Sequence, residues 1–561
     1  MSNDLLLKME GLQIEGFQED QWRGIVNGVD ITLNRGEVMG LIGESGAGKS
    51  TIGIASMGFC RPGCRIVGGS IMFDGMDLVT LSEEKKRALR GVRISYVAQS
   101  AAASFNPAHR LIGQYSETPV QHGLLPVHEA RKNARAIYRR LDLPDPDNIG
   151  NRYPHQVSGG QLQRLLVAMA MACKPDLIIF DEPTTALDVT TQIEVLAAIK
   201  EVIREFNTAA IYITHDLAVV AQIADRILVL RYGSKVEEGN TRELLANPKE
   251  DYTRALLSVR KVPEEKEEKA DFEDKNKVLL EIKDVSAAYG NGVEVLFDIH
   301  ATITRGKTVA VVDESGSGKT TLARVVTGLL PPIKGSISFD GQELPPSFKQ
   351  RKKELLRRLQ IIYHMPDIAL NPRQKVRDII GRAPGFYFGM TGQAKRDRVV
   401  ELLEMIDLSS KYEDRFPSEL SGGEKQRVCI ARALAAQPEL IICDEVTSTL
   451  DQLVAEGILK LLQDLQDELH VSYLFITHDL ATVRAIADEI IVMLQGRIVE
   501  HGPRDEILTP PHHEYTELLL ASVPRDGSRL ARWDFGTTQI RDGDRKRQHQ
   551  LAARNYFLSA Y

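Results

Sequence analysis

The chain has 561 residues, of which 43% are hydrophobic and 26% charged, and its net charge is −7. This length exceeds what one hydrophobic core supports, so we expect several globular domains. No apolar run approaches the roughly 18 residues that cross a bilayer, and an acidic chain lacks the broad basic face that nucleic-acid binding requires. The N-terminus also lacks a secretory pattern. These features predict a cytoplasmic protein that neither inserts into a membrane nor binds nucleic acid.

The first strong motif in chain order is GLIGESGAGKST, at 40–51. An apolar run ends there in a phosphate-loop pattern, whose backbone N–H groups and following helix N-terminus surround the β- and γ-phosphates of a nucleotide. The lysine adds a positive charge, and the serine hydroxyl is placed to bind Mg²⁺. The predicted nucleotide-binding residues are Gly43, Glu44, Ser45, Gly46, Gly48, Lys49, Ser50 and Thr51.

Five cysteines, two of them close together as Cys60 and Cys64, suit a reduced compartment. No second pair or histidine lies near them, so we expect neither a metal cluster nor a structural disulfide. Further on, the short apolar runs VMGLIG, ISYVAQ, LIIFDE, AAIYITHD and RILVLRYG alternate with helical patterns such as Thr191 to Phe206. This alternation predicts an α/β fold with a largely parallel sheet covered by helices.

Carboxylates end one of these strands. Asp181 follows the run LIIF, where it can hold Mg²⁺ through water, and Glu182 is positioned to orient an attacking water. The ordinary alternative, an Asp-Glu pair that caps a helix, is less consistent with a strand end. A serine-glycine-glycine stretch at 158–160 opens a helix and provides a second anion-binding end.

All these motifs occur twice. Lys49 recurs as Lys319, and three further blocks recur with one offset of 263 residues. The chain is therefore a duplicated domain of about 250 residues per copy. The stretch 261–277 has 12 charged residues among 17, which is typical of a solvated linker. We place the first domain at 1–260, the linker at 261–277, the second domain at 278–525 and a basic tail at 526–561.

The second copy supplies an equivalent set. Its loop reads AVVDESGSGKTT, with Asp313 in place of the first glycine, and its strand end carries Asp444 and Glu445. A carboxylate beside a triphosphate costs about 1 kcal/mol by Coulomb repulsion if partly shielded. The remaining predicted nucleotide-binding residues of this copy are Glu314, Ser315, Gly316, Gly318, Lys319, Thr320, Thr321, Ser421 and Gly423, and the first copy adds Ser158 and Gly160.

With these motifs the chain resembles the ATP-binding-cassette superfamily over nearly its whole length. The resemblance implies two tandem P-loop NTPase domains, each with a helical subdomain, that face each other head to tail. Each signature serine then reaches the ATP on the other copy's loop. It also implies that Gln99 contacts Mg²⁺ and water, and that His215 and His478 are the switch histidines. The implied Mg²⁺ ligands are Ser50, Gln99, Asp181, Thr320 and Asp444, and the adenine rings stack on Phe17 and Tyr289.

Further stretches resemble the peptide/nickel importer branch, among them SFNP, ALNPR, RYPHQVSGG and the two endings NPKEDYTRALL and TPPHHEYTELLLASVPR. This branch implies an ATP-hydrolysing importer subunit with two permeases and an extracytoplasmic binding protein as partners, peripheral on the cytoplasmic face of the inner membrane. Its solutes include peptides, opines and nickel complexes. Many relatives carry a cysteine cluster after the final motif, and this chain has no cysteine there, so we expect no iron–sulfur cluster.

Two other classes remain open: a soluble tandem cassette ATPase that acts on ribosomes or DNA, and a scaffold that has lost turnover. The short linker and the absence of zinc-type cysteines disfavour the first, and the two retained glutamates and histidines disfavour the second. The two sites are expected to differ in activity. Asp313 and His364 replace the usual glycine and glutamine of the second site, whereas the first site departs from the family only in Glu424.

Overall fold

The computed structural model describes residues 4–18, 21–184, 189–258, 277–290, 292–313, 317–448 and 450–521. The predicted loop residues Glu314, Ser315 and Gly316 lie outside these ranges, as do the tail 526–561 and all of the predicted linker except its last residue. The domain boundaries therefore stay predictions.

The first copy is built on two sheets. A six-stranded sheet has the order β10-β9-β3-β8-β7-β6, in which only the β9–β10 pair is antiparallel. Its strands are β3 (Val38–Ile42), β6 (Ile94–Val97), β7 (Leu177–Asp181), β8 (Ala209–Ile213), β9 (Arg226–Arg231) and β10 (Ser234–Asn240). A second, antiparallel sheet contains β1 (Leu5–Gln18), β2 (Gln21–Asn34), β4 (Cys64–Phe73) and β5 (Met76–Asp77).

The second copy repeats this plan. Its six-stranded sheet has the equivalent order β16-β17-β18-β13-β19-β20, with β13 (Thr308–Val312), β16 (Leu359–Ile362), β17 (Leu440–Asp444), β18 (Ser472–Thr477), β19 (Glu489–Leu494) and β20 (Arg497–Pro503). Its antiparallel sheet contains β11 (Val278–Ala288), β12 (Glu294–Thr304), β14 (Lys334–Phe339) and β15 (Gln342–Glu343). The predicted α/β fold is confirmed. The antiparallel sheets were not predicted from the sequence.

Helices cover both six-stranded sheets. In the first copy they are α1 (Lys49–Ala55), α2 (Glu83–Leu89), α3 (Ala101–Ser104), α4 (Leu111–Gln121), α5 (Val127–Arg140), α6 (Gly159–Ala170), α7 (Val189–Phe206), α8 (Leu217–Ile223), α9 (Thr241–Ala246) and α10 (Asp251–Ser258). In the second copy they are α11 (Lys319–Thr327), α12 (Lys353–Arg358), α13 (Pro366–Ala369), α14 (Val376–Phe388), α15 (Gly392–Met405), α16 (Gly422–Leu434), α17 (Gln452–Leu469), α18 (Leu480–Ile486), α19 (Arg504–Ile507) and α20 (Glu514–Ala521).

The central strands of each six-stranded sheet are buried on both faces, which explains their continuous apolar runs. In β8, Ala210 and Tyr212 belong to the core shared with α6 and α7, whereas Ala209, Ile211 and Ile213 belong to the core shared with α1 and the antiparallel sheet. Side chains that alternate along a strand therefore serve two different cores. This double packing fixes the strand ends that carry Asp181 and Asp444.

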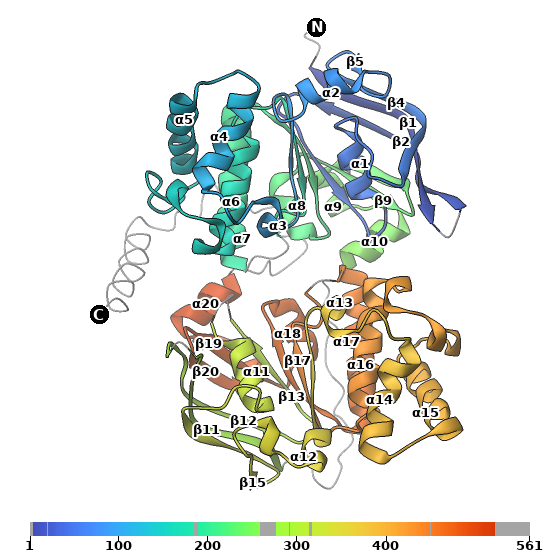
Figure 1. The fold of residues 1–561 in the computed structure, drawn as a ribbon, viewed down its shortest axis with the longest axis vertical. Coiled ribbons are helices and arrows are strands. Elements are labelled where there is room, and N and C mark those ends of the chain that lie inside the picture. Colours follow the sequence, from blue (N-terminus) through green and yellow to red (C-terminus); the bar gives the residue numbers. More distant parts are fainter. Residues whose placement is uncertain are drawn as a thin grey trace.

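The two copies lie in opposite orientations (Figure 1). The helical part of the first copy, α4 to α6, lies on the left above the sheets of the second, whereas the helical part of the second copy, α14 to α16, lies on the right, on the side of β1, β2 and β4. Helices α10 and α20 lie on the facing sides of the two copies. Leu453 of the second copy packs against the core of the first. This arrangement agrees with the head-to-tail expectation.

Candidate nucleotide-binding sites

The first phosphate loop joins β3 to α1. Lys49 is 6% exposed, and its Nζ donates hydrogen bonds to the carbonyl oxygens of Gly43 (2.6 Å) and Glu44 (2.8 Å). Burial holds the pKa of Lys49 below its ordinary value, although the nearby carboxylates of Glu182, Asp451 and Asp181 act in the opposite direction. The ammonium group therefore lies inside the loop, where phosphate oxygens can replace the two carbonyls.

Only glycine fits the first position of this loop. Gly43 has a φ of +147°, and a Cβ added there would lie 2.1 Å from the carbonyl oxygen of Leu230 on β9. The helix begins after Gly48, which also has a left-handed φ of 92°. The loop therefore turns sharply and leaves the N-terminus of α1 open toward the phosphates.

A hydroxyl and a carboxylate converge below the loop. Ser50 Oγ donates a hydrogen bond to Asp181 Oδ1 at 2.8 Å, and the hydroxyl of Tyr96 donates to Asp181 Oδ2 at 2.5 Å. Oxygen donors of these two kinds are the ligands that Mg²⁺ prefers. The residues present therefore fit the predicted magnesium site, and Tyr96 holds one of its ligands in place.

The predicted catalytic side chains of the first copy are in contact. Gln99 Nε2 donates to Glu182 Oε2 at 2.9 Å, and His215 Nδ1 lies 3.2 Å from Glu182 Oε1. Burial lowers the pKa of His215, but its hydrogen bond to Glu182 and the charge of that carboxylate outweigh burial, so the pKa is raised. Glu182 has a left-handed φ of 49°, a backbone conformation that is strained for glutamate.

The second site has the same plan with looser contacts. Lys319 Nζ donates to the carbonyl oxygen of Asp313 at 2.9 Å, and Thr320 Oγ1 donates to Asp444 Oδ1 at 3.3 Å. Ile361 occupies the position equivalent to Tyr96 and offers no hydroxyl. Within the described part of the chain, the buried Asp444 Oδ2 makes no hydrogen bond. In the first copy Asp181 accepts hydrogen bonds from Ser50 and Tyr96, whereas the equivalent Asp444 accepts one longer hydrogen bond from Thr320.

The charged groups of the second site influence one another's pKa values through these contacts. Burial raises the pKa of Asp444, the neighbouring Glu445 raises it further, and His364 acts in the opposite direction. His478 Nδ1 lies 3.7 Å from Glu445 Oε1. This interaction lowers the pKa of Glu445, whereas the pKa of His478 is raised because the contact with Glu445 outweighs burial. Glu445 has a left-handed φ of 51°, as its counterpart Glu182 does.

The two signature serines begin their helices as predicted. Ser158 caps α6 and Ser421 caps α16, and each side chain accepts a hydrogen bond from the backbone N–H three residues later. Both serines are exposed, and no hydrogen bond among the described residues joins either of them to the opposite phosphate loop. Glu424 completes the second capping box, and Tyr412 donates to its other oxygen at 2.6 Å. Glutamate thus serves here as the usual glutamine would.

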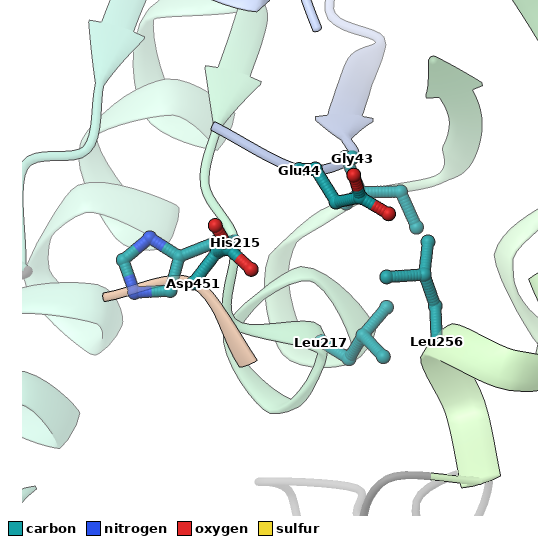
Figure 2. Close-up of a pocket in the computed structure, with 7 residues that line it drawn as sticks. Gly43, Glu44, His215, Leu217, Leu256 and Asp451 are labelled. Atoms are coloured by element: carbon teal, nitrogen blue, oxygen red, sulfur yellow. The ribbon is translucent and has the colours of Figure 1, made fainter. Parts of the chain in front are cut away.

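One residue of the second copy reaches the first site. Asp451 lines a small cavity together with Gly43, Glu44 and His215, and Figure 2 shows its side chain beside His215. The remaining walls of the cavity are apolar and include Leu217 and Leu256. Asp188, the equivalent residue of the first copy, lies outside the described residues. The cavity beside the first phosphate loop is therefore lined by residues of both copies.

The predicted adenine-stacking residues lie at the ends of equivalent strands. Phe17 on β1 is 50% exposed, and its ring packs against Trp22 at 5.3 Å between ring centroids. Tyr289 directly follows β11, is 36% exposed, and its hydroxyl hydrogen-bonds Thr321 at 3.1 Å and Arg324 at 3.1 Å. Both residues are exposed, and their stacking on adenine stays a prediction.

Three tyrosines at the sites escaped the sequence analysis. Tyr96 contacts Asp181; Tyr252 on α10 accepts a hydrogen bond from the backbone N–H of Glu44 at 3.2 Å; and Tyr515 on α20 donates to Asp313. The last two contacts join residues that are 208 and 202 positions apart. Tyr252 and Tyr515 share the 263-residue offset of the duplication and lie in the two endings NPKEDYTRALL and TPPHHEYTELLLASVPR, so both signals could have pointed to them.

Two family models match the chain. The model described as ABC transporter matches residues 26–185 and 296–448, and the model described as oligopeptide/dipeptide transporter, C-terminal region, matches residues 236–283 and 499–541. The chain belongs to the ABC transporter family. As a member of this family it is an ATP-binding subunit that hydrolyses ATP. Among the described residues, no helix combines the length and the apolar character that crossing a membrane demands.

Two curated relatives are similar in sequence to this chain along most of its length. The peptidoglycan transport ATP-binding protein YejF of Agrobacterium fabrum is 36% identical over 530 residues, which cover 92% of this chain and 96% of that protein. The glutathione import ATP-binding protein GsiA of Escherichia coli K12 is 36% identical over an alignment 561 residues long, which covers 92% of this chain and 89% of that protein. A solved structure of cbiO1 from Clostridium perfringens, part of the ABC transporter complex cbiONQ, is 30% identical, with a TM-score of 0.38 over 41% of this chain and 90% of that one.

Proposed function

We propose that this ABC transporter subunit drives the import of peptides or related polar solutes. The observation that carries the proposal is the oligopeptide/dipeptide C-terminal region, which matches at the end of both copies rather than of one. The relatives named for glutathione import and peptidoglycan transport point to solutes that contain short peptides. Opines and nickel complexes belong to the same proposed range.

In the proposed first site, ATP binds the loop from Gly43 to Thr51, and Ser421 of the second copy contacts its γ-phosphate. Mg²⁺ bound by Ser50, Asp181 and Gln99 would neutralise phosphate charge. Glu182 orients the attacking water and accepts its proton, and His215 holds that carboxylate in position at 3.2 Å. The short contacts around Glu182 support this assignment.

In the proposed second site, Lys319, Thr320 and Asp444 bind nucleotide and Mg²⁺, Ser158 comes from the first copy, and Glu445 orients the water. The 3.3 Å contact between Thr320 and Asp444 and the 3.7 Å separation of His478 from Glu445 support a weaker site than the first. His364 can donate a hydrogen bond, but imidazole is a poorer ligand than an amide oxygen for Mg²⁺. We therefore infer that hydrolysis at this site is slower.

The proposed partners are two permease subunits and an extracytoplasmic solute-binding protein. The chain would lie on the cytoplasmic face of the inner membrane and associate with it through the permeases. Binding of two ATP molecules would close the copies, and hydrolysis would reopen them, which switches the permeases between their two conformations. Both cassettes are present in one chain, so one copy of it would serve one permease pair.

Solute uptake tests the proposal. A strain that lacks this chain should lose uptake of radiolabelled short peptides, among them glutathione and a murein tripeptide, while uptake of an unrelated sugar stays normal. Wild-type chain should restore uptake, and the matched variant Glu182→Gln, which differs by one atom and a charge, should not. If the deletion leaves uptake of all the peptides intact and abolishes uptake of a nickel complex or an opine, the peptide assignment is wrong and the importer assignment stands.

A further inference from the structure

Two equivalent tyrosines contact the starts of the two phosphate loops in different ways. In the first copy, the hydroxyl of Tyr252 accepts a hydrogen bond from the backbone N–H of Glu44 at 3.2 Å. In the second copy, the hydroxyl of Tyr515 donates to the Oδ1 of Asp313. Both tyrosines are largely buried, and both belong to the helix that ends its copy. The terminal helix of each copy therefore touches the loop that binds phosphate.

The difference originates at the first loop position. In the first copy this position needs glycine, because a Cβ would overlap a carbonyl of the neighbouring strand β9. Asp313 does not adopt the left-handed φ of Gly43, and its side chain is 3% exposed. Its backbone carbonyl accepts from Lys319 while its carboxylate contacts Tyr515. The second loop thus leaves its strand by another backbone path and sends a side chain toward α20.

A carboxylate at this position opposes ATP binding unless it is held away from the phosphates. Like charges in a partly buried site repel more strongly than in water because the effective dielectric constant is lower. A hydroxyl that donates to a buried carboxylate stabilises its charge and fixes its direction. Tyr515 is in position to do this.

We propose that Asp313 and Tyr515 are a positioning pair for the second nucleotide site. Tyr515 holds the Asp313 carboxylate against α20, so that the loop can receive phosphates through Lys319 and its backbone N–H groups. Nucleotide binding at this site then depends on the position of α20, which carries Tyr515. The first site has no such dependence, because Gly43 has no side chain that could pair with Tyr252. The inference rests on the proposed ATP site at Lys319 and is independent of the solute.

Photolabelling of the full-length chain with 8-azido-ATP tests the pair, with labelled peptides mapped to each copy and displacement by ATP measured. Tyr515→Phe should weaken ATP competition about tenfold at the second site and leave the first unchanged, since a hydrogen bond to a buried charge is lost. Tyr252→Phe is the matched control and should leave the second site unchanged. Combining Tyr515→Phe with Asp313→Gly should restore affinity to within about twofold, because the carboxylate that Tyr515 positions is removed as well.

Three results would overturn the proposal. The first is unchanged competition at the second site in Tyr515→Phe. The second is an equal loss at both sites together with a lower unfolding midpoint, which would assign Tyr515 a purely structural role. The third is failure of Asp313→Gly to rescue the tyrosine variant. If the wild-type chain shows no displaceable label at the second loop, the proposed ATP site itself fails, and that outcome is visible before any variant is compared.

Discussion

The first and second nucleotide sites share one fold and differ in the contacts of single side chains. Both have a loop lysine, a strand-end Asp-Glu pair and a histidine on equivalent elements. In the first site, Asp181 receives two hydroxyl contacts and Glu182 is bridged to Gln99 and His215. The second site lacks the equivalents of Tyr96 and Gln99. The comparison teaches that a duplicated scaffold can keep its architecture while a few contacts at strand ends differ between the two copies.

The largest expected effect is on turnover. Glu182→Gln in the reconstituted transporter should lower steady-state ATPase activity on the order of 100-fold or more, because the first site is expected to carry most of the turnover and loses its base. Glu445→Gln should lower it by less than about tenfold. Equal losses from the two matched variants, or the reverse order, would show that the sites are not asymmetric in the proposed sense.

The next largest effect on turnover is expected at Gln99, which follows the edge strand β6. Gln99→His should give the first site the character of the second and lower turnover about 10-fold to 100-fold, because the amide that bonds Glu182 at 2.9 Å is replaced. The reciprocal variant His364→Gln should raise turnover if the second site is limited by this residue. ATPase assays at saturating MgATP measure both. A Gln99→His variant with normal turnover would remove this residue from the explanation.

A smaller effect is expected from the hydroxyl that supports Asp181. Tyr96→Phe keeps the ring and removes the 2.5 Å hydrogen bond. The Mg²⁺ concentration that gives half-maximal ATPase activity should rise about 10-fold, since partners of metal ligands typically contribute effects of about this size. The matched variant Ile361→Val should have no such effect. A changed maximal rate with an unchanged Mg²⁺ requirement would contradict a role in positioning the ligand.

The smallest effect should come from the adenine contacts. Tyr289→Ala should weaken ATP binding at the second site several-fold, since aromatic stacking contributes about 0.5–1.5 kcal/mol. Tyr289→Phe keeps the ring while removing the bonds to Thr321 and Arg324, so it separates stacking from the hydroxyl contacts. Phe17→Ala tests the first site in the same way. Unchanged affinity in Tyr289→Ala, measured by nucleotide titration, would discard stacking.

Local motifs made much of this molecule predictable. Lys49 and Asp181 lie where their sequence patterns indicated because a glycine-rich turn after a buried strand, and a carboxylate at a strand end, are dictated by neighbouring residues. The pairing of β1 with β2 on one side and β4 on the other was not foreseen, since those strands are only partly alternating and contain several register shifts. The Asp313–Tyr515 contact escaped because it joins residues 202 positions apart, and no local pattern records which distant side chain will fill a space.

Asp451, the residue of the second copy that lines the first site, gives the single-chain design a kinetic meaning. When two cassettes are separate subunits, the approach of such a residue depends on protein concentration. In one chain the same approach is an intramolecular event, with an effective concentration on the order of millimolar for a short connecting segment. Dilution therefore does not dissociate the pair, and pairing of the two different halves within one chain is favoured over pairing of identical halves from two chains. Every chain carries both sites in one molecule, so under the proposed asymmetry the order in which they hydrolyse ATP would be set by the molecule itself.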